Sequence, residues 1–434
     1  MRSKKLAALV VGLAFVAACG GSSTAQNSTP KLAALKNKVS VTFWYALPGN
    51  LEKALKAETD TFNSSQSVVT VNLVNKGSYN DLKTALLTAL AAGSGGPDMA
   101  QCIENHAAKY NQSGALADLS PYMNAADGLT EADKKDIFPA MLKDGQINGK
   151  TVMFPFNKST TVLYYNQDMF SAAGISSPPA TWDEFFIDAH KLKASDGSHW
   201  GADYGSIDSW ISMLYEFGGQ MYDSTSSPKK AAFNGSAGKL ITQKWHDAVA
   251  AKDVQTVSGP GFPDQVHFQN QKIAMYISTQ VSYQFLVTPI GSKFKFAEAP
   301  LPAGPSGIKD EMFGANACVM SKSSQDVQHG AFLYIKYFTN QANTATWAKT
   351  SSYMPLRLSA YNDLSSFYSQ HPEQAVGVGM LQKGQIFTVP FTSTFDDQRT
   401  EIGNNITAAI EGRKDIQAAL DSAAQKVTDL LTTG

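Results

Sequence analysis

Residues 38–45 form the run Lys-Val-Ser-Val-Thr-Phe-Trp-Tyr, in which β-branched and aromatic residues predict a first β-strand. The elements expected after it are a helix at 49–63, a strand at 68–74, a helix at 80–92 and a strand at 98–103. Alternation of strand and helix predicts an α/β fold with a parallel sheet covered by helices. Ligands of such sheets bind beyond the carboxyl ends of the strands, which here means near Tyr45, Tyr79 and Glu104.

Composition and charge exclude several classes of protein. The chain has 434 residues, of which 43% are hydrophobic and 17% charged, and 36 Lys+Arg against 37 Asp+Glu give a net charge of −1. This length predicts two or three domains of roughly 100–200 residues. The even charge argues against a nucleic-acid partner, which usually requires a basic excess. The apolar content argues against global disorder.

The N-terminus carries the marks of an export signal. Arg2, Lys4 and Lys5 precede the apolar run 6–17, and the sequence Val-Ala-Ala-Cys at 16–19 resembles a bacterial lipobox. We therefore expect residues 1–18 to be a lipoprotein signal peptide, Cys19 to be acylated and residues 19–37 to be a flexible tether. An ordinary secretory signal that happens to contain a cysteine is the alternative. No other run reaches the roughly 18 apolar residues that a membrane span needs.

Removal of the signal changes both the charge and the cysteine count. The signal takes three positive charges with it, leaving 33 Lys+Arg against 37 acidic residues, about −4 for the mature chain. Cys102 and Cys318 then remain, 216 residues apart. An exported compartment permits a disulfide between them, but we expect two buried, inert thiols.

From residue 152 onward the strict alternation of short strands and helices gives way to a long β-rich run and several proline-rich breaks. Residues 152–166 form a long β-rich run, and Thr181 with Glu184 three residues later predicts a helix N-terminus. Breaks rich in proline occur at 178–179, 299–305 and 353–355. Breaks spaced in this way suit a chain that crosses between two lobes more than once.

Seven short motifs carry a resemblance to a known family. In chain order they are Thr42-Phe43-Trp44, Gly77-Ser78-Tyr79, Pro97-Asp98, Gln101-Cys102-Ile103-Glu104, residues 155–166 (Pro-Phe-Asn-Lys-Ser-Thr-Thr-Val-Leu-Tyr-Tyr-Asn), Pro178-Pro179-Ala180-Thr181-Trp182 and Tyr353-Met354-Pro355. Together they resemble the extracellular solute-binding proteins of ABC importers, over essentially the whole mature chain. The run at 155–166, with Gly-x-Tyr and Glu104, is similar to the sn-glycerol-3-phosphate-binding branch.

The resemblance implies a fold and a mechanism. It implies a two-lobed α/β, periplasmic-binding-protein-like fold (type II) whose lobes close around one ligand. Lobe 1 is expected to comprise residues 38–156 and about 301–350, and lobe 2 residues 157–300 and about 351–434. Hinges are expected near 157–161, 298–302 and 350–355. The implied partners are a small-molecule ligand and the membrane permease of an importer, with the protein a monomer anchored by lipid to the outer face of the cell membrane, without cofactor or metal.

The resemblance also implies a set of ligand-binding residues. They are Tyr79, Glu104, Ser159, Trp210, Ser278, Gly314, Tyr353 and Arg399. A carboxylate such as Glu104 suits two vicinal hydroxyls, and a guanidinium such as Arg399 suits a phosphate. If Ser278 caps a helix at 280–286, the backbone N–H groups of that helix would add to the phosphate site.

One position departs from the branch. Where the branch has two nearby tryptophans, this chain keeps Trp210 but has Ile207 three residues earlier. The lost aromatic wall leaves room, so free glycerol-3-phosphate is expected to bind weakly. A glycerophosphodiester such as glycerophosphocholine becomes the alternative ligand, because a quaternary ammonium favours an aromatic face.

Other interpretations compete with this site. Tyr79, Tyr353 and Trp210 could be core aromatics, Glu104 could cap a helix near Asn105, and Arg399 could pair with Asp396, Asp397 or Glu401 at the surface. An oligosaccharide-binding subunit of a sugar importer is the second binding hypothesis. Motifs for a serine nucleophile, a phosphate loop or a zinc protease do not occur, and the spacing of the seven histidines fits no metal site. We therefore expect no enzyme, with an exported glycoside hydrolase as the less favoured alternative.

Overall fold

The computed structural model describes residues 31–227, 229–259, 262–388 and 392–433. The predicted signal peptide, Cys19 and residues 19–30 of the predicted tether lie outside these residues. From Leu32 onward the chain forms one compact unit. Among the described residues, no helix is both long and apolar enough to cross a membrane.

The alternation of strand and helix predicted for the first part of the chain is confirmed. Strands β1 (Val39–Tyr45), β2 (Val69–Asn75) and β3 (Met99–Ile103) lie parallel, with β1 between the other two. Helices α1 (Gly49–Ser65) and α2 (Tyr79–Ala92) connect them. Ser78 begins α2 with a reciprocal capping box to Asp81, which fixes where Tyr79 starts the helix.

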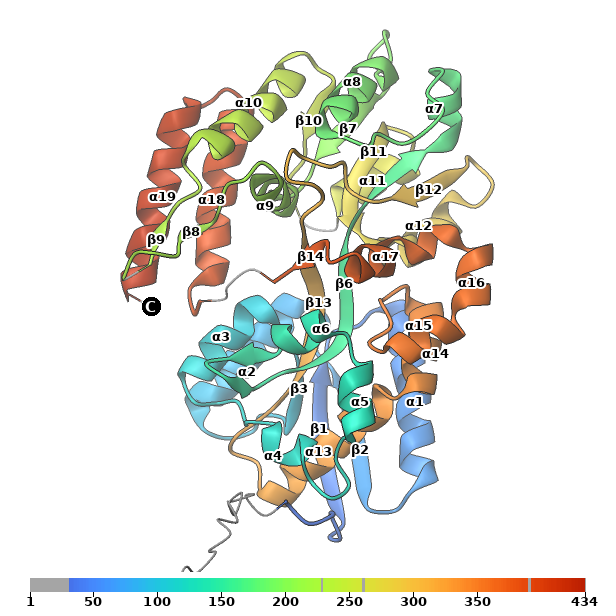
Figure 1. The fold of residues 1–434 in the computed structure, drawn as a ribbon, viewed down its shortest axis with the longest axis vertical. Coiled ribbons are helices and arrows are strands. Elements are labelled where there is room, and N and C mark those ends of the chain that lie inside the picture. The colour runs from blue at the N-terminus through green and yellow to red at the C-terminus, as the bar shows by residue number, and fades with distance from the viewer. Residues whose placement is uncertain (1–30, 228, 260–261, 389–391, 434) are drawn as a thin grey trace, which may run out of the picture. The chain divides into compact units, whose positions relative to one another are not determined.

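Two long strands at the centre connect the halves of one ten-stranded sheet. The main path of the sheet is β10-β7-β11-β6-β13-β3-β1-β2, with β12 paired to β6 and β14 to β13. Strand β6 (Phe154–Asn166) pairs antiparallel with β13 (Asp310–Val319) through its first half and with β11 (Ile273–Thr279) through its second. Figure 1 shows β6 and β13 running through the middle of the molecule. The β-rich run predicted at 152–166 is thus confirmed.

The remaining elements complete the two halves. The other strands are β4 (Gln146–Ile147), β5 (Lys150–Thr151), β7 (Trp200–Tyr204), β8 (Tyr222–Asp223), β9 (Lys230–Ala231), β10 (Val254–Thr256), β12 (Phe296–Ala299) and β14 (Ile386–Phe387). The helices up to residue 250 are α3 (Glu104–Gln112), α4 (Ser120–Met123), α5 (Glu131–Asp136), α6 (Pro139–Asp144), α7 (Gln167–Ala172), α8 (Trp182–Leu192), α9 (Ile207–Glu216) and α10 (Ser236–Ala250). The later helices are α11 (Pro263–Gln269), α12 (Tyr283–Ile290), α13 (Gln325–Phe338), α14 (Gln341–Ser351), α15 (Leu358–Asp363), α16 (Ser365–Gln370), α17 (Val376–Gln382), α18 (Phe395–Ile410) and α19 (Ile416–Thr433). Thr181 caps α8 in the predicted box with Glu184.

Two large hydrophobic clusters define the two lobes. In the first, aromatic residues of β1, α13 and α14 pack together, with Phe43, Phe338 and Trp347 among them. The second joins α8, α9 and α10 to α18 and α19, with Trp182 and Trp245 at its centre. The predicted lobe boundaries stay predictions, because the whole region packs as one unit.

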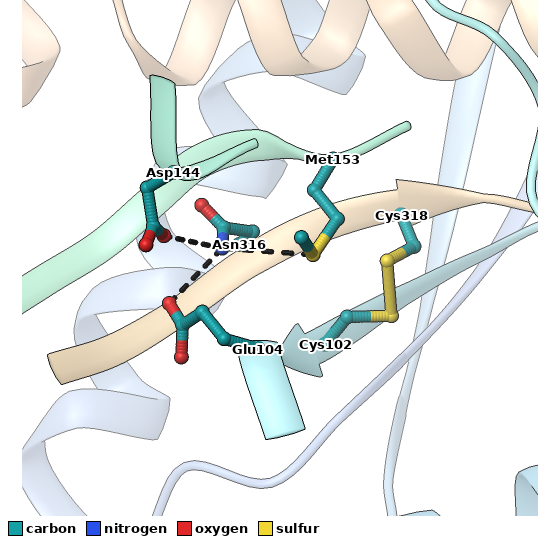
Figure 2. Close-up of a disulfide and its surroundings, with 6 residues drawn as sticks. All are labelled: Cys102, Glu104, Asp144, Met153, Asn316 and Cys318. Atoms are coloured by element: carbon teal, nitrogen blue, oxygen red, sulfur yellow. Dashed lines mark hydrogen bonds between the residues drawn. A yellow bond between two sulfur atoms is a disulfide. The ribbon is translucent and has the colours of Figure 1, made fainter. Parts of the chain in front are cut away.

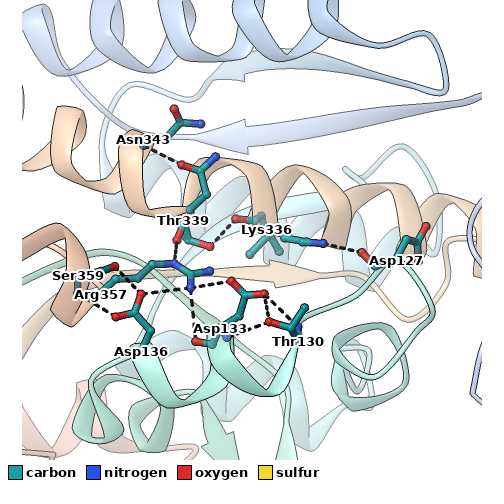
Figure 3. Close-up of polar contacts among 11 residues, drawn as sticks. Asp127, Thr130, Asp133, Asp136, Lys336, Thr339, Asn343, Arg357 and Ser359 are labelled. Atoms are coloured by element: carbon teal, nitrogen blue, oxygen red, sulfur yellow. Dashed lines mark hydrogen bonds and ion pairs between the residues drawn. The ribbon is translucent and has the colours of Figure 1, made fainter.

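The chain beyond α14 is tied to the first lobe by a buried arginine. Arg357, 3% exposed, donates from Nε to the Thr339 carbonyl at 2.6 Å and from Nη1 to Asp133 Oδ1 at 2.9 Å (Figure 3). The same carboxylate caps α5 through Thr130. Arg357 therefore fixes the segment that follows the predicted hinge at 350–355.

The expectation of two separate thiols is wrong, because Cys102 and Cys318 form a disulfide with their Cα atoms 5.9 Å apart (Figure 2). In the β3–β13 register Cys102 lies opposite Asn316, and Cys318 opposite Ala100. The cysteines are therefore diagonal neighbours on one face of adjacent strands, a spacing that a disulfide can bridge.

Candidate functional site

Three charged side chains are buried together where β3, β6 and β13 meet. Lys158 Nζ of β6 donates to a carboxylate oxygen of Glu104, the first residue of α3, and to Asp144 Oδ2 at 2.7 Å. Asn316 Nδ2 of β13 donates to the same two carboxylate oxygens, at 3.0 Å each, and Figure 2 shows it lying between them. Ile103 occupies the N-cap position of α3, and Glu104 adds an acidic side chain to the first turn.

The electrostatics of this group follow from its burial. Burial raises the pKa of Glu104 to about 8, although the Lys158 charge acts in the opposite direction. For Lys158 burial opposes the charged form, but Asp144 and Glu104 raise its pKa overall. Two acidic groups share one cation, which suits hydroxyl donors from a ligand.

Two tyrosines and two amides adjoin the charged group. Tyr79 Oη accepts from Asn157 Nδ2 at 3.4 Å and from Gln101 Nε2 at 3.3 Å, and Tyr353 lies near enough to influence the pKa of Tyr79. The Tyr353 ring stacks on Trp347, with centroids 6.0 Å apart and planes inclined by 5°. Burial raises the pKa of both tyrosines, and Glu104 adds to this for Tyr79. The structure thus brings Tyr79, Tyr353 and Glu104 together, and their role toward a ligand stays a prediction.

Arg399 of α18 lies at the other side of this group. Its guanidinium pairs with Asp208, the second residue of α9, and with Glu311 Oε2 of β13 at 3.4 Å. Its side chain is 15% exposed, so a surface pair with Asp396, Asp397 or Glu401 is not the arrangement that forms. Burial lowers the pKa of Arg399 to about 10, while the charge of Glu104 acts to raise it. Arg399 and Glu104 are therefore close enough to interact electrostatically.

Ser159 and Gly314 lie on paired strands beside Lys158. Ser159 is buried opposite Phe313, and its hydroxyl donates to the Thr160 carbonyl at 3.3 Å. Gly314 lies opposite Lys158 with φ +98°, and a Cβ there would come within 2.0 Å of the Asn157 carbonyl oxygen. The close approach of β6 and β13 thus requires glycine at 314, whatever its role toward a ligand.

Trp210 and Ile207 both lie on α9 and pack against the second hydrophobic cluster. Trp210 is fully buried in the second hydrophobic cluster, and its Nε1 donates to Thr242 Oγ1 at 3.0 Å. Its position on α9 turns its ring nitrogen toward α10, and a role of Trp210 at a ligand stays a prediction. Ile207 begins α9 and is partly buried against the same cluster.

Ser278 does not act as the helix cap that was predicted. Its hydroxyl lies 2.9 Å from that of Ser282, and a 3₁₀ turn at Gln280–Ser282 precedes α12. Thr279 occupies the N-cap position, and no side chain caps either element. Helix N–H groups capped by Ser278 are therefore not part of this site.

Sequence reasoning missed the residues that complete the group: Asp144, Lys158, Asp208, Glu311 and Asn316. Lys158 offered a signal, as the lysine within an otherwise neutral β-rich run. The others have no local signal. His106, beside Glu104 in sequence, pairs instead with Asp396 of α18 at 2.9 Å. No cluster of metal-ligating side chains occurs in the described ranges.

The fold and this buried polar group define a two-lobed binding protein. The chain belongs to the bacterial extracellular solute-binding protein family, which residues 57–376 match. It is 26% identical to the sn-glycerol-3-phosphate-binding periplasmic protein UgpB of Yersinia pseudotuberculosis, over 91% of this chain and 93% of that protein. For UgpB of Escherichia coli the identity is 25%, over 92% of this chain and 95% of that protein.

Solved structures confirm the type II fold. UgpB from Mycobacterium tuberculosis in complex with glycerophosphocholine superposes with a TM-score of 0.78 at 20% identity, covering 92% of this chain and 99% of that one. The GacH receptor of Streptomyces glaucescens, solved unliganded and with acarbose, gives a TM-score of 0.79 at 20% identity, with the same coverage.

Proposed function

We propose that this protein is the substrate-binding subunit of an ABC importer that captures glycerol-3-phosphate or a glycerophosphodiester such as glycerophosphocholine. The observation that carries the proposal is the placement of Arg399 and Glu104 in one buried polar group. A guanidinium binds phosphate oxygens in bidentate fashion, and a carboxylate accepts hydroxyl hydrogens. Glycerol bearing a phosphate presents both kinds of partner at its two ends.

The charge of the site favours the phosphodiester. Asp208 and Glu311 already accompany Arg399, and Glu104 and Asp144 accompany Lys158, so carboxyl groups outnumber cations. A phosphomonoester carries about −1.5 to −2 at pH 7, since its second pKa is near 6, whereas a diester carries a single charge. The Asp208 carboxylate beside the arginine repels the doubly charged ligand more strongly. Ile207, where the branch has tryptophan, leaves room for a head group.

The proposed mechanism is lobe closure, followed by delivery to the permease. The ligand stabilises the closed form because it contacts residues of both lobes only when they meet. The predicted hinge at 157–161 lies in β6, where Asp310 accepts from Thr161 N and from Ser212 Oγ, at 2.8 Å each. The predicted hinges at 298–302 and 350–355 begin in the last residues of β12 and of α14. We further propose that the protein works as a monomer, held to the outer face of the cell membrane through Cys19, and turns over no substrate.

Titration calorimetry on the mature chain tests the ligand. Glycerophosphocholine, sn-glycerol-3-phosphate and a maltooligosaccharide are compared for wild type and Arg399→Ala. The proposal expects stoichiometric binding of a glycerol phosphate, weakened at least about 100-fold by Arg399→Ala, because a charge-assisted contact is lost. If the protein binds only the oligosaccharide, and Arg399→Ala changes that affinity little, the result would favour a sugar importer. This second candidate function is retained because a structural neighbour was solved with acarbose.

A further inference from the structure

The arginine proposed to bind phosphate is already engaged by carboxyl groups of its own chain. Asp208 pairs with Nη2 of Arg399, and Glu311 lies 3.4 Å from Nη1. Both nitrogens face outward from the guanidinium and would be the donors to a phosphate. A phosphate at Arg399 must therefore share the guanidinium with these groups or displace one of them.

Asp208 is the more accessible of the two partners. Its side chain is 20% exposed, whereas that of Glu311 is 4% exposed. Burial raises the pKa of Glu311 well above its ordinary value, with Asp310 adding to the effect, so Glu311 holds a proton more readily than an exposed carboxyl group. Asp208 is thus the partner whose negative charge a ligand meets.

Local structure holds Asp208 in this position. Ser206 Oγ donates to Asp208 Oδ2 at 2.8 Å and accepts from the Asp208 backbone N–H at 3.0 Å, which fixes the start of α9. The other oxygen, Oδ1, is the one that pairs with Arg399. The carboxylate is therefore aimed at the guanidinium by the helix terminus itself.

From this geometry, and resting on the proposed function, we propose that Asp208 is a specificity-determining residue. Its carboxylate competes with the ligand phosphate for Arg399 and discriminates against phosphomonoesters relative to phosphodiesters. The physical reason is repulsion between like charges, which grows with the charge of the ligand. A diester carries one negative charge, so its binding at Arg399 beside or in place of Asp208 costs less electrostatic free energy than the binding of a monoester.

Removal of this one charge tests the proposal. The variants are Asp208→Asn, which keeps the size and an acceptor for Ser206, and Asp208→Ala. The matched control is Asp183→Asn, because Asp183 is also the second residue of a helix in the same lobe but pairs with Lys244 at the surface. Calorimetry on each full mature chain measures Kd for sn-glycerol-3-phosphate, glycerophosphocholine and inorganic phosphate, and thermal unfolding verifies the fold.

We expect Asp208→Asn to tighten sn-glycerol-3-phosphate binding by about tenfold and glycerophosphocholine binding by less than about threefold. Asp208→Ala should act in the same direction, and Asp183→Asn should change neither Kd by more than about twofold. Equal changes for both ligands, no change, or weaker monoester binding would overturn the proposal, as Asp208 would then only position Arg399. Loss of folding in both Asp208 variants would also overturn it.

The inorganic phosphate arm separates this proposal from the proposed function. If the wild type binds neither sn-glycerol-3-phosphate nor glycerophosphocholine, the proposed function fails. A gain of at least about fivefold in inorganic phosphate affinity for Asp208→Asn over Asp183→Asn would then still support competition for Arg399. An unchanged affinity for inorganic phosphate in that case would overturn the competition as well.

Discussion

His106 Nε2 lies 2.9 Å from Asp396 Oδ2, and this contact joins α3 to α18, which belong to different predicted lobes. His106 belongs to α3, which packs on β3 and β13, whereas Asp396 is the second residue of α18, which packs on α10 and α19. Lys83 of α2 reaches the same oxygen at 3.0 Å. Separation of the lobes must break this pair of contacts, whatever ligand is bound.

Asp396→Asn should therefore weaken closure without changing specificity. The variant loses the ion pair with Lys83 and the acceptor charge facing His106, so the Kd of every ligand should rise by a similar factor of about 2 to 10. Calorimetry across the ligand panel measures this, with Asp397→Asn, the next and exposed residue of α18, as control. A change confined to one ligand would place Asp396 in the binding site instead.

Lys158 is the counter-ion of two buried carboxyl groups, and its removal should destabilise the protein. Lys158→Met should lower the free energy of unfolding by about 3–5 kcal/mol, because Glu104 and Asp144 would remain buried without a cation. Urea unfolding measures it. Lys56→Met, which breaks an exposed pair with Glu52, should cost less than about 1 kcal/mol. Adding Glu104→Gln to Lys158→Met should restore part of the loss, and failure to do so would argue against the charge explanation.

Gly314 should tolerate no side chain, for a reason of packing. Gly314→Ala places a Cβ 2.0 Å from the Asn157 carbonyl oxygen and should cost about 3 kcal/mol or more. Gly307→Ala is the matched control, because Gly307 also has positive φ, +79°, but has nothing within 4 Å of its Cβ position. This control should cost about 1 kcal/mol. Equal losses in urea unfolding would mean that backbone conformation alone matters at 314.

Glu58 should make stability fall as pH rises. Burial raises its pKa from 4.5 to about 8, and its Oε2 is buried without a hydrogen-bond partner. Between pH 4.5 and about pH 8, Glu58 has lost its proton in the unfolded chain but keeps it in the folded protein. The free energy of unfolding therefore falls as pH rises through this range, and the fall is complete above about pH 8. Glu58→Gln should raise the free energy of unfolding by about 2 kcal/mol at pH 8 and change it little at pH 4.

Urea unfolding of Glu58→Gln and wild type at pH 4, 6 and 8 tests this dependence. Asp60→Asn, an exposed residue of the same helix, is the control and should follow the wild type. Parallel curves for wild type and Glu58→Gln would show that Glu58 titrates normally.

Local patterns in the sequence determined much of the fold. The strands at 39–45, 69–75 and 99–103 and the capping box of Thr181 with Glu184 follow from residues within a few positions of one another. Propensity, periodicity and capping act over such distances. The motifs that extend from residue 42 to residue 355 also identified the family without any knowledge of contacts.

The site depended on contacts that local patterns do not encode. Arg399 meets Glu311 across 88 residues of chain, and Asn316 meets Glu104 across 212. The disulfide, expected as two free thiols, exists because antiparallel pairing of β3 with β13 places both cysteines on one face. The orientation of α9, likewise, places Trp210 in the second hydrophobic cluster, a contact that no local pattern shows.

By itself, then, the sequence determined the α/β alternation and the family, and it singled out Glu104 and Arg399 as candidate ligand-binding residues. Tertiary structure decided which side chains contact them: Lys158 and Asn316 for Glu104, and Asp208 and Glu311 for Arg399. The physical reason is that the pKa and availability of a buried charge depend on partners brought close by sheet order and helix orientation, not by position along the chain.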